Sequence, residues 1–346
     1  MPMTPAAPQT YVPNAVLDHE PFANVREMAG KDLLTLTQLT PACTRELLGL
    51  AAKVKSNRAD YSETLKGKHG ILIFEKASLR TRITFETGFT MLGGHAIYMD
   101  HSVQRLGERE AVKDYAKNLE RWLHCIIARV YSQAIVEELA EHASIPVINA
   151  LSEREHPCQG LADIMTLWEF APDFRVEGTR LRIAYVGDGN NVAHSLMHAA
   201  ALCGCDITVI TPKKYEPLEA FVAETTALAK ESGSTLTVTN KLSAVEGHHA
   251  VYTDVWVSMG QADEAGKRLK VFGDYQIDAE LMATASKGLA ASWGPAKFMH
   301  CLPARRGVEV TDEVIDAPSS VVYAQAENRM HAQNALLAAI LGNVRT

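Results

Sequence analysis

The tetrapeptide His300-Cys301-Leu302-Pro303 places a thiol and a rigid turn at the end of an apolar segment. Phe298–Cys301 reads as a buried strand, and charged residues follow it, so we expect Cys301 to lie at the mouth of a cleft. Because proline restricts the residue before it, we expect the chain there to be extended, with the carbonyls of Cys301 and Leu302 free to accept hydrogen bonds. A cysteine in an apolar run is more often a core residue. The functional interpretation therefore depends on three further groups of polar residues.

The first group is Phe-Glu-Lys-Ala-Ser-Leu-Arg-Thr-Arg at 74–82, after the apolar strand Ile71–Phe74. A helical pattern follows it, formed by Phe85, Phe89 and Leu92 and ended by Gly93-Gly94. Ser78 is therefore a natural N-cap, and the free N–H groups of the first turn point outward with the positive end of the helix dipole. With the Thr81 hydroxyl and the Arg80 guanidinium, this site suits a phosphate dianion. The alternative is a capped helix with solvated arginines.

The second group is His156-Pro157-Cys158-Gln159, immediately before another helical pattern. His156 can donate a hydrogen bond to a carbonyl oxygen, and Gln159 can recognise an amide. A helix start with a packed histidine explains the same residues equally well.

The third group consists of Asp254 and the segment Ser258-Met259-Gly260. Asp254 directly follows the short apolar strand Ala250–Thr253. A carboxylate at a strand end before a glycine-containing loop is typical of an element that closes on an ammonium group. An ordinary surface loop is the alternative.

Taken together, these motifs resemble the aspartate/ornithine carbamoyltransferase superfamily. The resemblance runs from about residue 33 to the C-terminus and rests on Ser-x-Arg-Thr-Arg, His-Pro-x-Gln and His-Cys-Leu-Pro in that order. Ser258-Met259-Gly260 and His-Cys-Leu-Pro place the chain closest to the ornithine branch. Aspartate enzymes carry a His-Pro-Leu-Pro-Arg type of loop instead.

The resemblance implies transfer of the carbamoyl group of carbamoyl phosphate to the side-chain amine of L-ornithine, giving L-citrulline and phosphate. Such a reaction serves arginine biosynthesis or arginine and ornithine catabolism. The residues that the resemblance assigns to carbamoyl phosphate are Ser78, Leu79, Arg80, Thr81, Arg105, Arg129, His156, Gln159, Cys301, Leu302 and Arg329. Those that it assigns to ornithine are Asn191, Asp254, Ser258 and Met259.

Among these, Arg129, His156 and Cys301 are the expected catalytic residues. Arg129 and His156 would polarise the carbamoyl oxygen, and the Cys301 thiol would help to select the reactive protonation state of the amine. From the sequence alone, Arg129 could equally well form a salt bridge at the edge of the core, and Arg329 could equally well be a surface residue. The expected mechanism needs no metal or organic cofactor.

Two positions depart from the family pattern. Leu79 replaces the commoner threonine, and Arg105 stands where a glutamine or histidine often reaches into the active site of a neighbouring subunit. If Arg105 acts in that way, the smallest competent unit is an oligomer. We expect a homotrimer, or a multiple of trimers, with shared active sites.

Gly187-Asp188-Gly189 after an apolar strand allows a rival interpretation, the start of a dinucleotide-binding fingerprint. Val192 occupies the place of the third glycine, so a tight turn that presents Asn191 to a substrate is the better interpretation.

The whole sequence predicts two α/β domains with parallel sheets, joined by interdomain helices, because strands and helices alternate. We expect an N-terminal arm at 1–32, a carbamoyl-phosphate-binding domain at 33–160, and an ornithine-binding domain at 161–326. A C-terminal helix at 327–342 would pack back on the first domain. The strands expected are Ile71–Phe74, Ala96–Met99, Cys125–Arg129, Pro146–Asn149, Leu181–Gly187, Asp206–Ile210, Thr235–Thr239, Ala250–Thr253, Gly288–Ser292 and Phe298–Cys301. The proline-rich arm is expected to be disordered or loosely docked.

The composition of the chain restricts the class of protein to which it can belong. A length of 346 residues, with 47% hydrophobic and 22% charged residues, fits a two-domain globular enzyme. A net charge of −7 argues against nucleic-acid binding, and no apolar run reaches eighteen residues, so no membrane span is expected. The six cysteines form no CxxC pair, which favours free thiols in a reducing compartment and a cytoplasmic location.

Other functions remain open at this point. The chain could carbamoylate another amine such as putrescine or an acylated ornithine, act as an NAD-dependent oxidoreductase, or be a catalytically silent scaffold. Ser258-Met259-Gly260 with Asp254 favours a free α-amino acid, and Val192 disfavours NAD. The near-complete set of expected catalytic residues disfavours the scaffold.

Overall fold

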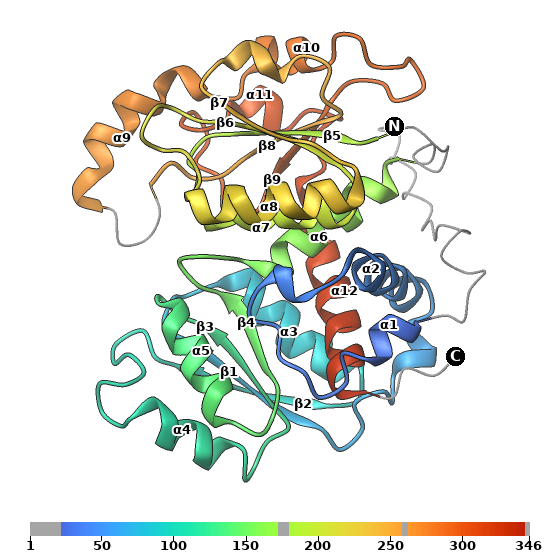
Figure 1. Cartoon of the computed structure of the whole chain (residues 1–346), viewed down its shortest axis with the longest axis vertical. Coiled ribbons are helices and arrows are strands. Elements are labelled where there is room, and N and C mark those ends of the chain that lie inside the picture. The colour runs from blue at the N-terminus through green and yellow to red at the C-terminus, as the bar shows by residue number, and fades with distance from the viewer. Residues whose placement is uncertain (1–21, 172–179, 258–261, 343–346) are drawn as a thin grey trace, which may run out of the picture.

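Two parallel sheets form the framework of the protein (Figure 1). The computed structural model describes residues 22–171, 180–257 and 262–342. Sheet A has the strand order β2-β1-β3-β4, and sheet B has the order β7-β6-β5-β8-β9. The strands of sheet A are β1 (His69–Phe74), β2 (His95–Asp100), β3 (Cys125–Arg129) and β4 (Val147–Leu151). Those of sheet B are β5 (Arg182–Val186), β6 (Asp206–Ile210), β7 (Leu236–Thr239), β8 (Ala250–Thr253) and β9 (Lys297–His300).

Helices connect the strands, as parallel pairing requires. Those before and among the strands of sheet A are α1 (Ala23–Arg26), α2 (Pro41–Ser56), α3 (Leu79–Met91), α4 (Val112–Leu119) and α5 (Gln133–His142). The later ones are α6 (Pro157–Glu169), α7 (Asn191–Leu202), α8 (Glu219–Ser232), α9 (Ala265–Phe272), α10 (Ala279–Ala285), α11 (Asp312–Ile315) and α12 (Val322–Leu341). Short 3-10 helices are η2 (Leu36–Gln38), η3 (Arg58–Tyr61), η4 (Leu242–Val245), η5 (Ala262–Glu264) and η6 (Gly273–Tyr275). Within the described ranges, no helix is both long and apolar enough to cross a bilayer.

The two faces of sheet A pack into different apolar clusters because side chains alternate along a strand. On β1, Ile71 and Ile73 join the cluster under α4 and α5, whereas Leu72 and Phe74 join the larger cluster that contains Phe85 of α3. Cover on both faces explains why every residue of β3 is buried. The continuous apolar runs in the sequence therefore become central strands.

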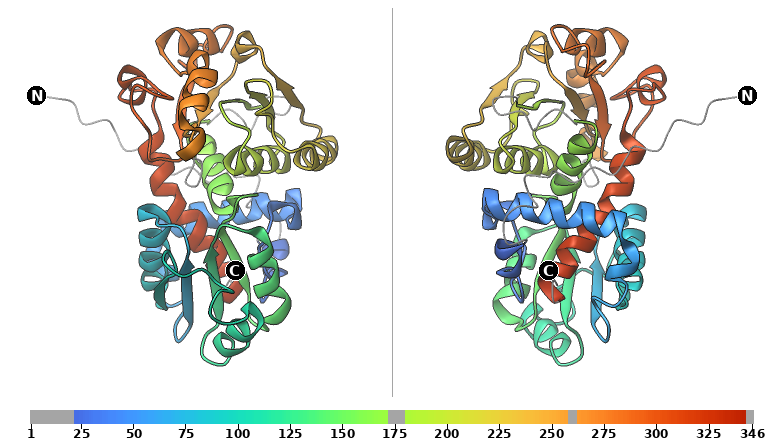
Figure 2. Two further views of the ribbon diagram at one scale, coloured as in Figure 1. Left: turned by 90° about the vertical axis from the view of Figure 1, so that its left-hand side faces the viewer. Right: turned by 90° about the vertical axis from the view of Figure 1, so that its right-hand side faces the viewer.

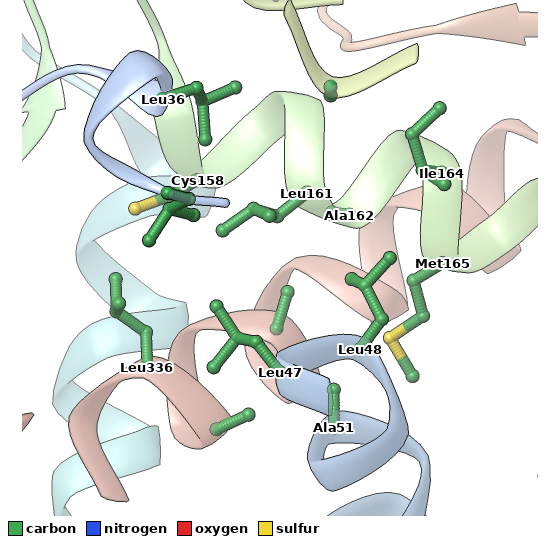
Figure 3. Packing of buried hydrophobic residues seen from close by; sticks show 14 of the residues in the cluster. Leu36, Leu47, Leu48, Ala51, Cys158, Leu161, Ala162, Ile164, Met165 and Leu336 are labelled. Atoms are coloured by element: carbon green, nitrogen blue, oxygen red, sulfur yellow. The ribbon is translucent and has the colours of Figure 1, made fainter. Parts of the chain in front are cut away.

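Three helices, α2, α6 and α12, form the junction between the domains. Leu47 of α2, Leu161 of α6 and Leu336 of α12 meet there (Figure 3). The two views of Figure 2 show α12 running from the junction between the domains down along the first domain. It packs against α2, α3 and α6. The predicted fold class, including the return of the last helix to the first domain, is confirmed.

The strand orders also define where a ligand can bind. In sheet A the order reverses between β1 and β3, and in sheet B it reverses between β5 and β8. Open parallel sheets bind ligands at the carboxyl ends of the strands at such a reversal. The residues that follow these ends are Ser78 after β1, Arg129 at the end of β3, Asn191 after β5 and Asp254 after β8.

Two local predictions are wrong. Gly288–Ser292 is not a strand: Gly288 has φ +74°, a turn closes at Trp293, and most of the segment is exposed. Its alanines are too small to bury much apolar surface, so they do not hold a central strand. Leu302 is not extended but has φ +58°, and its N–H donates to His300 Nδ1 at 2.8 Å. This local hydrogen bond stabilises a turn that overrides the usual preference before proline.

Two boundaries also differ from those expected. The last helix begins at Val322 rather than residue 327. Part of the segment expected to be a loosely docked arm is packed, because Phe22 and Val25 are buried in the cluster that includes α2 and α12. Residues 1–21 of that arm lie outside the described residues.

Candidate functional site

The start of α3 has the geometry of an anion site. Ser78 caps the helix, and its hydroxyl accepts a hydrogen bond from Thr81 N at 3.2 Å. Leu79 is largely exposed, whereas Arg80 is half-buried and Thr81 is buried. The sequence folds this way because β1 ends in a short polar loop and the spacing of Phe85 and Phe89 fixes the buried face of the helix. The predicted N-cap is confirmed.

Two arginines from distant parts of the chain converge on Thr81. Arg129 Nη1 donates to Thr81 Oγ1 at 3.4 Å, and Arg329 Nη2 donates to the same oxygen at 2.7 Å. Neither these two nor Arg80 forms an ion pair with a carboxylate in the part of the chain that the structure describes. Burial, together with the charge of Arg329, lowers the pKa of Arg129 to about 9. Three guanidinium groups at a helix start make a strong site for a multivalent anion.

His156 and Gln159 lie beside this arginine group at the start of α6. Burial and the charges of Arg329 and Arg129 hold the pKa of His156 well below its usual range, so its imidazole is neutral at pH 7. A neutral imidazole donates through one nitrogen only. Gln159 Nε2 donates to Asp163 Oδ1 at 2.7 Å, and Gln159 Oε1 is buried without a partner among the described residues.

The facing wall comes from sheet B and carries the opposite charge. Cys301 Sγ donates to Asp254 Oδ1 at 3.1 Å, and Asn190 Nδ2 donates to Asp254 Oδ2 at 2.9 Å. Burial and the Asp254 charge raise the pKa of Cys301 well above its usual range, so the thiol is neutral at pH 7. A Cys301 thiolate would lie close enough to Arg129 to influence its pKa, which places the two walls in one site.

The other predicted residues that the structure describes are Asn191, Leu302 and Arg105. Asn191 Nδ2 donates to Ser152 O at 2.6 Å, and so bridges from α7 to the loop after β4. Leu302 is partly buried, at the turn that follows Cys301. Arg105 is exposed and stacks over the Tyr131 ring of its own chain, 4.2 Å from the centroid. Ser258 and Met259 lie outside the described residues.

The glycine-rich turn after β5 leaves no room for a dinucleotide at Gly189. A Cβ atom there would lie 2.3 Å from Pro217 N, and Gly189 N donates to Tyr215 O at 2.8 Å. The glycine is needed because the protein's own backbone approaches closely. Asn190 Oδ1 accepts from Val192 N and from Ala193 N, which caps α7.

Sequence reasoning missed three polar residues of this site. Asn190 caps α7 and also holds Asp254, and Asp163 and Gln325 lie behind Gln159. An asparagine before a helix is a detectable cap signal. The spacing of four between Gln159 and Asp163 is a detectable same-face signal. Nothing in the sequence relates Gln325 to Asp163, because the two residues lie 162 positions apart in the chain.

Asp254, His300 and Cys301 also have a spacing that metal ligands can adopt, because one ligand atom from each lies within 4.8 Å of the others. Both His300 nitrogens already have neighbours: Nδ1 accepts from Leu302 N, and Nε2 lies 3.3 Å from Glu309 Oε1. A metal ion would have to displace one of them. A mechanism without metal stays our prediction.

Comparisons with known proteins assign both domains to the same family. A family model described as "Aspartate/ornithine carbamoyltransferase, carbamoyl-P binding domain" matches residues 31–169, and one described as "Aspartate/ornithine carbamoyltransferase, Asp/Orn binding domain" matches residues 179–340. The chain belongs to the aspartate/ornithine carbamoyltransferase family. The predicted resemblance is therefore confirmed.

Individual members of the family align along most of the chain. The ornithine carbamoyltransferase of Shewanella oneidensis is 46% identical over 307 residues, which cover 89% of this chain and 98% of that protein. The Listeria monocytogenes ornithine carbamoyltransferase is 47% identical over 316 residues, 90% of this chain and 96% of that protein. The solved structure of ornithine carbamoyltransferase from Pyrococcus furiosus has a TM-score of 0.85 and 43% identity, and covers 92% of this chain and 99% of that chain.

Proposed function

We propose that this protein transfers the carbamoyl group of carbamoyl phosphate to the side-chain amine of L-ornithine, giving L-citrulline and phosphate. One observation carries the proposal: three arginines gather at the start of α3, opposite a wall that holds Asp254 and Cys301. The first wall suits a phosphorylated donor, and the second suits an ammonium-bearing acceptor. Membership of the family supports the same reaction.

The phosphate half of the reaction would use the first wall. Ser78, Arg80, Thr81 and the first-turn amides, including that of Leu79, would hold the phosphate. Arg129, Arg329 and the Thr81 hydroxyl they share would also touch the donor. As the amine attacks the carbamoyl carbon, negative charge builds on the carbamoyl oxygen, and Arg129, Thr81 and the neutral His156 would stabilise it.

Hydrogen-bond acceptors of the protein would bind the NH₂ group of carbamoyl phosphate. Gln159 Oε1 and the carbonyls of Cys301 and Leu302 would accept from the carbamoyl NH₂. The bond between the carbonyl carbon and the phosphate oxygen then breaks, and the leaving phosphate accepts the proton that the amine gives up. Holding both reactants in one site supplies much of the rate enhancement.

Ornithine would be held by the second wall and by residues outside the described ranges. Asp254 and Ser258 would bind its α-ammonium, and Asn191 and the Met259 amide its carboxylate. A neutral Cys301 thiol beside the amine would favour the deprotonated, nucleophilic form, because it adds no negative charge that would stabilise the ammonium.

The two domains would divide these tasks. Residues 33–160 with the helix at 327–342 would bind carbamoyl phosphate, and residues 161–326 would bind ornithine. We place the reaction in the cytoplasm, in arginine biosynthesis or in arginine and ornithine catabolism. All six cysteines are free, which fits a reducing compartment.

Association with further copies is part of the proposal. Four large apolar side chains are exposed on α3, on the edge strand β2 and in the loop after it. They are Leu79 at 72%, Ile83 at 49%, Ile97 at 44% and Val103 at 98%. An edge strand flanked by apolar residues is a surface that another chain can cover. Leu79 directly precedes Arg80 in the chain, so association there would lie close to the arginine group. The number of copies in the proposal, a homotrimer in which Arg105 serves a neighbouring site, comes from the resemblance to the family.

The test is a product assay with a panel of amines. Purified protein with ¹³C-labelled carbamoyl phosphate and L-ornithine should form citrulline, followed by NMR. Putrescine, N-acetylornithine and L-aspartate should react at least about a hundredfold more slowly in kcat/KM. Putrescine lacks the carboxylate, N-acetylornithine lacks the free α-ammonium, and L-aspartate lacks the side-chain amine that attacks the carbamoyl carbon. Faster transfer to any of the three, or no transfer to ornithine, would overturn the proposal.

A further inference from the structure

Asp163 is a buried carboxylate behind the candidate site that the mechanism does not use. It lies on α6, one helical turn after Gln159, and is fully buried. Its Oδ1 accepts two hydrogen bonds of 2.7 Å, one from Gln159 Nε2 and one from Gln325 Nε2. No lysine or arginine in the described part of the chain forms an ion pair with it. Its Oδ1 is therefore shared by two side-chain amides, and the Tyr252 hydroxyl is a third polar neighbour of the carboxyl group.

The hydrogen bond to Asp163 determines which end of the Gln159 amide faces the bound carbamoyl phosphate. A side-chain amide has one donor end and one acceptor end, and rotation by 180° exchanges them. With Nε2 bound to Asp163, Oε1 is the free end, and it is buried without a partner among the described residues. An unpaired buried acceptor beside a substrate discriminates strongly in favour of a group that can donate to it.

The second hydrogen bond extends the same arrangement to sheet B. Gln325 Oε1 accepts from His300 N at 3.0 Å, immediately before Cys301. Asp163 thereby connects α6 to α12 and to the end of β9. Because both Nε2 groups meet one oxygen, both amides have a defined orientation.

Burial raises the pKa of Asp163 to about 7. Protonation on Oδ2 would leave Oδ1 as an acceptor, so either charge state can hold the two amides. The orientation of Gln159 therefore depends on an acceptor oxygen at this position rather than on the charge.

We propose that Asp163 is a positioning residue that fixes Gln159 as a hydrogen-bond acceptor and so selects acyl phosphates that carry an NH₂ group. This inference rests on the proposed function and deepens it. Acetyl phosphate is the natural probe, because it replaces the NH₂ of carbamoyl phosphate with a methyl group and keeps the phosphate. The quantity of interest is the Kd of acetyl phosphate divided by the Kd of carbamoyl phosphate.

The experiment measures both dissociation constants by calorimetry in wild type and three variants. In Asp163→Ala the amide of Gln159 is free to rotate, and the ratio should fall at least about tenfold. In Asp163→Asn an acceptor oxygen remains, and the ratio should stay within about threefold of wild type. Thr166→Val is the matched control: Thr166 is also buried on α6 but bonds to Asn328 at 3.0 Å and to Ala162 O, away from Gln159. Its ratio should not change.

An Asp163→Ala ratio equal to that of wild type would overturn the inference, as would an equal fall in Thr166→Val. Damage to the fold alone would weaken both ligands together and leave the ratio unaltered. If Asp163→Ala does not fold, NMR of glutamine-labelled wild type decides instead. The Gln159 side-chain N–H signals, assigned with Gln159→Met, should exchange slowly with solvent, and fast exchange would contradict the inference. Wild type that fails to form citrulline would refute the proposed function separately.

Discussion

Arg80 lies in the first turn of α3, next to its N-cap. Its guanidinium group forms no ion pair with a carboxylate in the described ranges. Arg80→Ala should cost about 3 kcal/mol of transition-state stabilisation, or about a hundredfold in kcat/KM, because a charge-assisted contact to a dianion is lost. The matched control is Arg82→Ala. Arg82 lies on the same helix but contacts Glu86 at 3.4 Å and stacks over Tyr98. Steady-state kinetics should show near-normal turnover for Arg82→Ala only; near-normal turnover of Arg80→Ala at low carbamoyl phosphate would refute the phosphate assignment.

Asp254 has two roles that one substitution should separate. Asp254→Asn removes the counter-charge of the ornithine ammonium, so ornithine binding should weaken far more than carbamoyl phosphate binding. It also removes a charge that raises the pKa of Cys301, so that pKa should fall and the thiolate should appear at lower pH. Calorimetry tests the first effect, and the pH profile of Cys301 alkylation tests the second. Equal losses for both ligands, or an alkylation profile that does not move, would contradict this division.

At this scale the sequence predicts the residues that lie within a local motif. Ser78, Arg80 and Thr81 share one helix turn, so their geometry follows from a strand end and an N-cap. The pairing of Arg129 with Arg329 around Thr81 does not follow, because it depends on where α12 returns. Resemblance supplied those residues, whereas Asp163 and Gln325 had no such guide and were missed.

The contact between α6 and α7 joins a helix of the junction to the helix that follows β5. Gly160 follows Gln159, and a Cβ atom there would lie 2.7 Å from Ser195 O and 3.2 Å from Leu36 Cδ1. Gly160→Ala should therefore lower the free energy of unfolding by about 1–3 kcal/mol, because the helices must separate. It should also reduce activity, since Ser195 Oγ accepts from His156 N at 2.7 Å.

The matched control for Gly160→Ala is Gly266→Ala on α9, where a Cβ atom would meet nothing within 4 Å. That variant should be unchanged or more stable by about 0.4–1 kcal/mol. Denaturant unfolding measures both. Equal stability of the two variants would show that the α6–α7 contact is not tight.

Strand and helix periodicity predicted most elements, because apolar runs such as Ile71–Phe74 and Cys125–Arg129 require cover on both faces. The failures have local causes. Most residues of Gly288–Ser292 are apolar, but their side chains are too small to bury much surface. The turn at Leu302 depends on a hydrogen bond to His300. Helix ends such as Val322 depend on contacts beyond the window of any periodic pattern.

At the scale of the whole molecule, a shared active site predicts complementation between inactive variants. Co-expressed Arg105→Ala and Arg80→Ala chains should form mixed trimers in which about a quarter of the sites have both arginines. Activity should return well above that of either variant alone. Mixtures with no more activity than the single variants would place Arg105 in its own chain's site, where it already contacts Tyr131.

The arginine wall of sheet A and the Asp254–Cys301 wall of sheet B should enclose both substrates together. Alkylation of Cys301 at alkaline pH tests this enclosure, with peptide mapping to separate Cys301 from the other five cysteines. The states compared are free enzyme, enzyme with carbamoyl phosphate, and enzyme with carbamoyl phosphate and the unreactive analogue norvaline. Labelling of the partly buried Cys301 should be measurable in the free enzyme and should fall to its lowest level once both ligands are bound. Equal labelling in all three states would place Cys301 outside the site and refute a shared enclosure of the two substrates.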